Sequence, residues 1–95
     1  MPEQAEIFQA QLQAGLELPA DKKFYFNGYT IAMSPSDILI VLLFNNQPVA
    51  TLNTSSIIAK TLMKSIEGLI TDYEKRTGQR VLTLDEVASA TSEAS

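Results

Sequence analysis

The clearest pattern along the chain is a helical repeat of apolar positions in its second half. Between residues 54 and 77, apolar side chains recur every three or four positions opposite charged ones, which predicts a long amphipathic helix. The apolar positions are Ile58, Leu62, Ile66 or Met63, Leu69 or Ile70, and Tyr73. Asn53 or Thr54 is suited to cap the start of this helix, and Gly78 is suited to end it.

Three apolar runs before this helix predict strands. Residues 24–33 are rich in aromatic and β-branched side chains, with a bulge or kink expected at Asn27-Gly28. Residues 38–44 contain no polar side chain, so we expect a central strand that is covered on both faces. Residues 49–52 form the third run. The predicted fold is α+β, with a three-stranded antiparallel meander followed by the long helix.

Turn-forming residues separate these runs. Residues 34–37 combine serine, proline and aspartate, which favour a tight turn. Residues 45–48 begin with two asparagines, which tolerate the positive φ of a hairpin turn. Both connections are short enough to join neighbouring antiparallel strands.

Both ends of the chain predict short helical segments. Residues 3–14 carry Ala5, Phe8 and Leu12 at helical spacing and are followed by Gly15. Thr83 and Glu86 have the spacing of a capping box, which predicts a helix over about residues 84–90. We expect disorder in residues 89–95. The predicted organisation is an N-terminal arm (1–20), one α+β domain (21–82), and a short helix with a flexible tail (83–95).

Composition excludes several kinds of chemistry. The chain has 95 residues and a net charge of −4, with neither cysteine nor histidine. It therefore lacks disulfides, a thiolate nucleophile and the commonest general base and metal ligand. Its acidic balance argues against a dedicated nucleic-acid binder. We expect no catalytic residues, no metal and no cofactor.

The sequence also bears on location. Its first residues are acidic and polar rather than basic and then apolar, so we see no secretory signal. The longest apolar run has seven residues, whereas a membrane-spanning helix needs about 20. We therefore expect a cytoplasmic protein without a membrane span.

The predicted elements do not cover one another completely. A helix of about 24 residues is about 36 Å long, whereas a seven-residue strand covers about 23 Å, and one helix shields one face of a sheet. We therefore expect a homo-oligomer, most simply a dimer. The predicted interface comprises Ile38, Ile40, Leu42, Phe44, Leu62, Ile66, Leu69 and Tyr73. The alternative is a monomer whose terminal helices fold over the exposed face.

Two other surfaces suit nucleic acid. Lys60, Lys64, Lys75 and Arg76 form a basic helix face that suits phosphate, although a solvated helix face is the simpler explanation for them. Aromatic side chains that suit base stacking occur at Phe24, Tyr25, Phe26 and Tyr29. Packing within the sheet is the simpler explanation for these aromatics.

Carboxylate pairs are the remaining candidates for catalysis. Asp72 with Glu74, and Asp85 with Glu86, are the closest pairs. Residues two apart on a helix do not face each other, and acidic residues are common in a first helical turn. Asn53-Thr54-Ser55 matches the glycosylation pattern but reads better as a helix cap.

The segment from Tyr29 to Gly78 resembles a family of short bacterial proteins of unknown function. The residues that carry this resemblance are Met33-Ser34-Pro35-Ser36-Asp37, Ala59-Lys60-Thr61-Leu62 and Asp72-Tyr73-Glu74-Lys75-Arg76-Thr77-Gly78. In that family a small meander precedes a helix that closes on a Tyr-Glu-x-x-x-Gly-like signature. The resemblance implies a fold but brings no catalytic residues.

The sequence thus predicts a non-catalytic homo-oligomeric interaction or adaptor module, whose partner it does not name. Two alternatives remain open. One is weak nucleic-acid binding through the basic helix face, and the other is a small-molecule or lipid pocket beneath the long helix.

Overall fold

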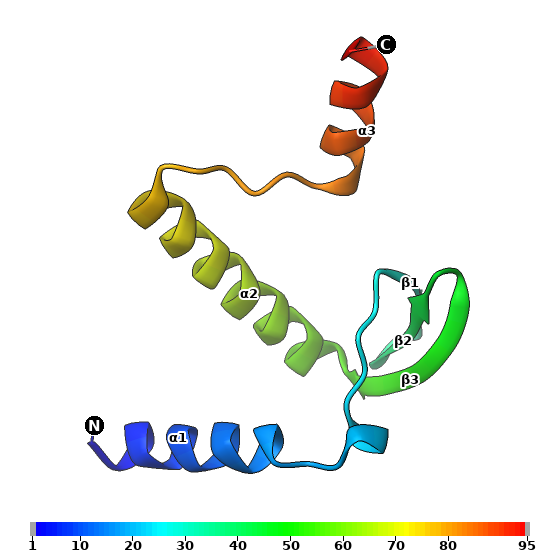
Figure 1. Ribbon diagram of the computed structural model, residues 1–95. Coiled ribbons are helices and arrows are strands. Elements are labelled where there is room, and N and C mark those ends of the chain that lie inside the picture. The colour runs from blue at the N-terminus through cyan, green and yellow to red at the C-terminus, as the bar shows by residue number, and fades with distance from the viewer. Residues whose placement is uncertain (1, 95) are drawn as a thin grey trace. The chain divides into compact units, whose positions relative to one another are not determined.

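The computed structural model describes residues 2–94. Contacts along the chain divide it into two units, residues 1–54 and 55–95, and each is described by itself. The fold class is α+β, as predicted, with one three-stranded sheet, the long helix and shorter helical segments (Figure 1). The boundary between the units falls inside the predicted 21–82 domain, whose own limits stay a prediction.

The first unit begins with helical segments. Helix α1 spans Pro2–Leu16 and is followed by the short 3-10 helix η1, Ala20–Lys22. Helix α1 starts close to the predicted position but continues through Gly15, which lies inside its last turn instead of ending it. Its large apolar side chains, Ile7, Phe8, Leu12 and Leu16, are all exposed.

The sheet has the strand order β1-β2-β3, with β1 at Gly28–Met33, β2 at Asp37–Phe44 and β3 at Gln47–Ser55. β1 runs antiparallel to β2, in a register that pairs Met33 with Ile38 and Gly28 with Leu43. β3 extends beyond the predicted 49–52, because its pairing continues from the turn at one end to the helix start at the other. The predicted meander is therefore present.

The first strand is shorter than its aromatic sequence indicated. The backbone N–H of Asn27 donates to the Leu43 carbonyl at 3.0 Å, although the register aligns Leu43 with Gly28. Two residues thus oppose one, which is the arrangement of a β-bulge and confirms the expected irregularity. Pairing ends there, so residues 24–27 lie outside the strand and the predicted start at Phe24 is wrong.

Tight turns join the strands. Ser34 closes the first turn by donating its N–H to the Asp37 carbonyl at 3.0 Å, and its hydroxyl accepts from the Asp37 N–H at 3.2 Å. Asn45 and Asn46 form the second turn with φ of 51° and 69°. Two successive positive φ values define the hairpin turn whose twist matches that of the strands.

The Asn27 side chain ties the bulge to the second turn. Its amide donates to the Asn45 side-chain oxygen at 3.0 Å, and its own side-chain oxygen accepts from the Asn45 N–H at 2.9 Å. We expect Asn27→Ala to lower the free energy of unfolding by about 1 kcal/mol, because both exposed bonds are lost. Chemical denaturation measures this loss. Asn53→Ala, at an exposed asparagine on β3, is the control, and an equal loss there would contradict the role of the bridge.

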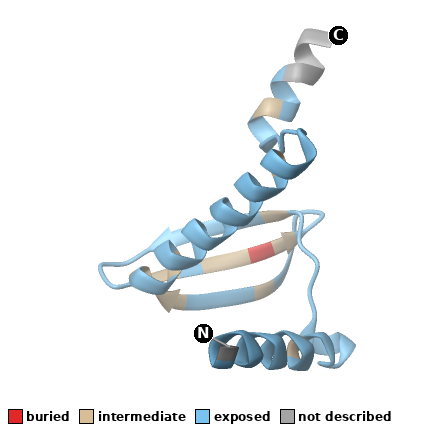
Figure 2. Ribbon diagram, turned by 90° about the vertical axis from the view of Figure 1, so that its left-hand side faces the viewer, coloured by how far each residue is buried: buried red, intermediate tan, exposed pale blue. Residues whose placement is uncertain are grey.

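The core of the described chain is very small. Leu42, two residues before the end of β2, is 6% exposed and is the only buried hydrophobic residue among those described (Figure 2). Leu39 and Phe44 on the same strand are 37% and 41% exposed. In the single chain both faces of β2 therefore keep contact with water. Complete cover of this strand was expected only in an oligomer, and it stays a prediction.

The second unit begins with helix α2, Ser56–Thr77. Ser55 caps its start, because its hydroxyl accepts from the Ile58 N–H at 3.1 Å, so the cap lies just after the predicted Asn53 or Thr54. Gly78 ends the helix in the left-handed conformation at φ 70°, as predicted. Lys75 and Arg76 lie in the last turn, where positive charge suits the helix dipole.

Helix α3, Leu84–Ala94, follows a short linker. Thr83 and Glu86 form the predicted capping box, with the Thr83 N–H donating to the Glu86 carboxylate at 3.0 Å and the Glu86 N–H donating to the Thr83 hydroxyl at 3.2 Å. The helix continues beyond residue 90, so the expectation of disorder from residue 89 is wrong as far as Ala94. Ser95 lies outside the described residues. The capping box explains where α3 begins.

Candidate assembly surfaces

One face of the sheet gathers large apolar side chains from two strands. The register places Tyr29, Ile31 and Met33 of β1 directly opposite Leu42, Ile40 and Ile38 of β2, and directly opposed residues share a face. Phe44 follows on the same face by the alternation of β2. We call these seven residues the tyrosine face. The four interface residues predicted on β2 are thus brought together.

The β1 side of the tyrosine face is open to solvent. Tyr29, Ile31 and Met33 are 59%, 54% and 69% exposed, whereas Ile38 and Ile40 are half-buried. Each apolar side chain stabilises a fold by about 1.5–3 kcal/mol when it is fully buried, so this face leaves much of that free energy unrealised. The sequence did not assign the β1 residues to the interface. Their alternation with Thr30 and Ala32 is the signal that indicates a shared face.

The other face of the sheet carries smaller side chains. Gly28, Thr30 and Ala32 of β1 lie opposite Leu43, Val41 and Leu39 of β2. A Cβ placed on Gly28 would lie 3.6 Å from the Leu43 Cβ, which is ordinary contact. Only the tyrosine face therefore presents a protruding apolar surface along the β1 edge.

The interface residues predicted on the long helix also lie together. At 3.6 residues per turn, Leu62, Ile66, Leu69 and Tyr73 fall within an arc of about 60°. None of them is buried, and their exposed fractions range from 43% for Tyr73 to 70% for Leu69. We call these four residues the α2 stripe. It forms a continuous apolar surface along the helix.

The predicted basic face is interrupted. Lys60, Lys64 and Lys75 fall within an arc of about 60°, but Arg76 lies about 100° from Lys75. Glu67 lies one turn after Lys64, at the edge of the lysine arc. The four basic residues therefore do not form one uninterrupted stripe that would follow a phosphate backbone.

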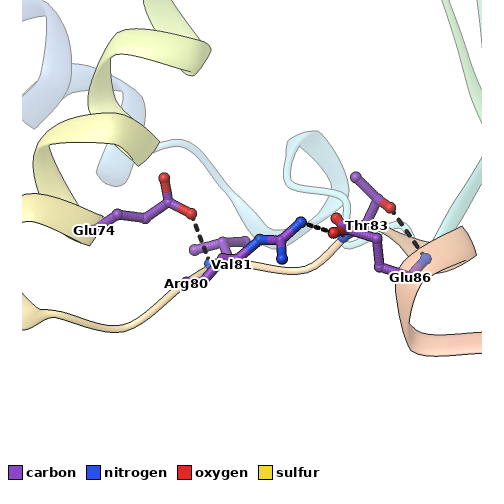
Figure 3. A network of polar contacts seen from close by, with 5 residues as sticks. All are labelled: Glu74, Arg80, Val81, Thr83 and Glu86. Carbon is purple, nitrogen blue, oxygen red and sulfur yellow. Dashed lines mark hydrogen bonds and ion pairs between the residues drawn. The ribbon is translucent and has the colours of Figure 1, made fainter. Parts of the chain in front are cut away.

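One member of each candidate carboxylate pair, Glu74 and Glu86, instead makes structural contacts around the linker (Figure 3). The Glu74 carboxylate accepts from the Val81 N–H at 2.8 Å, which holds the linker against the end of α2. Glu86 caps α3 and pairs with the Arg80 guanidinium. Among the described residues, no three acidic side chains come together in a way that could hold a metal ion.

The aromatic residues before the bulge do not line up along a strand. Phe24, Tyr25 and Phe26 precede β1, and only Tyr29 belongs to it. The Tyr25 ring meets the Phe44 ring edge-on, with centroids 6.0 Å apart and planes at 80°. This contact packs one aromatic against the sheet, but all four aromatics stay exposed, so the favoured role in core packing stays a prediction.

A depression of about 310 Å³ lies at the end of the sheet near the first turn. It is lined by Ala32, Met33, Ser34, Asp37, Leu39 and Asn53. Every one of these residues is exposed, so the depression is a hollow in the surface rather than an enclosed site. All of its lining residues belong to the first unit, and the pocket expected beneath the long helix stays a prediction.

No helix within residues 2–94 combines the length and apolar character needed to cross a membrane.

A scan against models of protein families and searches of curated proteins and solved structures found no match. The resemblance to short bacterial proteins therefore stays a prediction.

Proposed function

We propose that the chain is a non-catalytic assembly module that forms homo-oligomers through its apolar surfaces. The observation that carries this proposal is that Leu42 alone is buried among the described hydrophobic residues, while the β1 side of the tyrosine face and the α2 stripe are exposed. The sheet has two apolar faces, whereas α2 offers one stripe. A second copy supplies matching apolar surface without any additional partner.

The residues of the chain support a structural role over a chemical one. Glu74 and Glu86, one from each candidate carboxylate pair, are engaged in holding the linker and capping α3. As an adaptor, the module would present copies of itself to a partner protein. The absence of cysteine suits a reducing compartment, and the bacterial resemblance supports the bacterial cytoplasm as its location.

Sedimentation equilibrium at micromolar concentration tests the proposal. The chain mass is 10.4 kDa, and we expect twice this mass or a higher multiple. Ile66→Asp places a charge on the α2 stripe and should raise the dissociation constant at least about tenfold if that stripe lies in the interface. Thr71→Asp, on the polar side of the same helix, is the matched control. A compact monomer of the unchanged chain would refute the proposal.

A further inference from the structure

The outer edge of β1 presents unpaired backbone groups. In an antiparallel ladder every second residue directs its N–H and C=O toward the neighbouring strand. Ser34 donates its N–H to Asp37. By the same alternation Ala32, Thr30 and Gly28 direct their backbone groups toward β2. The alternate residues, Tyr29, Ile31 and Met33, therefore direct their backbone groups away from β2. β1 is the first strand of the described sheet, and no strand lies beyond it there.

This edge lacks the features that keep edge strands from pairing. β1 has the sequence Gly-Tyr-Thr-Ile-Ala-Met, without charge and without proline, whereas protected edges carry lysine, proline or a central bulge. The bulge at Asn27-Gly28 lies at one end and leaves residues 29–33 regular. The edge is therefore a template for one more strand.

The opposite edge of the sheet is partly blocked. A two-residue turn at Asn45 and Asn46 places Phe44 opposite Gln47 as a hydrogen-bonded pair. By alternation Pro48 then occupies an outward position of β3, where its missing N–H costs no bond within the sheet. A strand approaching β3 would find no donor at that position. Of the two edges, β1 is thus the better suited to pairing.

We propose that β1 pairs antiparallel with β1 of a second copy around a two-fold axis at Ile31, which joins the two sheets into one of six strands. This proposal rests on the proposed homo-oligomeric function and names the surface that forms the dimer. Ile31 lies opposite Ile31 of the second copy, and Tyr29 lies opposite its Met33. Every outward N–H and C=O of these three residues then finds a partner across the axis.

Side chains favour a second copy over an unrelated extended peptide as the occupant. In this register Tyr29, Ile31 and Met33 of both copies project from the same side of the joined sheet. The tyrosine faces of the two copies thus become continuous. The three β1 side chains, which are 54% to 69% exposed in a single chain, lie at the centre of the new contact. No charge lies on β1 of either copy, so charge repulsion between the two strands does not oppose their pairing.

Paired proline variants provide the first test, with sedimentation equilibrium as the measurement. Ile31→Pro removes an outward N–H at the proposed axis and should raise the dimer dissociation constant at least about 100-fold. Ala50→Pro removes an outward N–H from β3 and should change the dimer dissociation constant less than about threefold. Far-ultraviolet circular dichroism checks that both variants keep their sheet. The reverse order of effects would place the contact on β3 and overturn the proposal.

Spin labels provide a second test that does not depend on the proline variants folding. The chain has no cysteine, so Thr30→Cys and Thr51→Cys each carry one label. Edge pairing separates the two Thr30 backbones by less than about 10 Å and the two Thr51 backbones by about 24 Å, five strand spacings. We expect dipolar spectroscopy to show this order of distances.

The outcomes separate the two proposals. A chain that sediments as a monomer contradicts the homo-oligomeric function itself. A dimer with similar Thr30 and Thr51 distances has stacked faces, about 10 Å apart, and contradicts only the edge pairing. A dimer in which the two Thr51 labels are closer together than the two Thr30 labels pairs through β3, and this result also contradicts the β1 edge pairing.

Discussion

Replacing Leu42 with alanine should lower the free energy of unfolding by about 3 kcal/mol at a fixed chain concentration. Leu42 lies on the central strand, two residues before its end, and is 6% exposed. Its removal leaves a cavity where the sheet has its only buried hydrophobic side chain among the described residues. The expected loss lies within the range measured for buried leucines.

Leu39→Ala is the matched control for this measurement. Leu39 lies on the same strand but on the opposite face, and it is 37% exposed. Because less of its surface leaves water on folding, its replacement should cost about 1 kcal/mol. Urea denaturation followed by circular dichroism compares the two variants. Equal losses would show that burial of Leu42 contributes no more to the free energy of unfolding than the partly exposed Leu39 does.

Proline at Val41 should disrupt the sheet, with a loss of about 3 kcal/mol or more. Val41 pairs with Thr30, and the alternation from the first turn directs its N–H into the β1 ladder. Proline removes this donor from a strand that has neighbours on both sides. Loss of the strand signal in circular dichroism, and a lower denaturation midpoint, measure the effect.

Ala50→Pro tests the same alternation from the other side. Ala50 lies on β3 with its N–H directed outward by the two-residue turn, so proline there should cost less than about 1 kcal/mol. If both proline variants were equally damaging, the assignment of inward and outward backbone groups would be wrong. The edge proposed for the dimer would then lose its basis.

Periodicity predicted the regular elements well, because apolar spacing reflects the geometry of helices and strands directly. The long helix and its end at Gly78 followed from the spacing of Leu62, Ile66 and Tyr73 and from the freedom of glycine at positive φ. The two asparagines of the second turn followed from their tolerance of the same conformation. These features depend on neighbouring residues alone.

Features that depend on distant residues were less predictable. The start of β1 moved from Phe24 to Gly28 because Asn27 binds Asn45, a partner 18 positions away. β2 contains only apolar residues inside the strand from Ile38 onward, so the sequence could not tell which face is protected, and it predicted cover on both. The tail was predicted to be disordered from its small residues, although its capping box was recognised.

The candidate surfaces were only half visible in the sequence. Alternation along β2 placed Ile38, Ile40, Leu42 and Phe44 on one face, but the β1 residues that complete this face required the register. The sequence of a uniformly apolar strand does not determine its register, because the side chains on its two faces are alike. The turn at Ser34 and Asp37 fixes it, and with it the position of Tyr29 beside Leu42.

Pro48 has a consequence for how far assembly proceeds under the proposed pairing. A sheet with two equally receptive margins adds copies at each end and grows into a fibre. In the proposed dimer the β1 edge is paired across the two-fold axis, and the β3 edge is interrupted by Pro48, which has no N–H to donate. The addition of further chains therefore stops after two. A single imino acid thus favours a closed, finite particle over open-ended polymerisation.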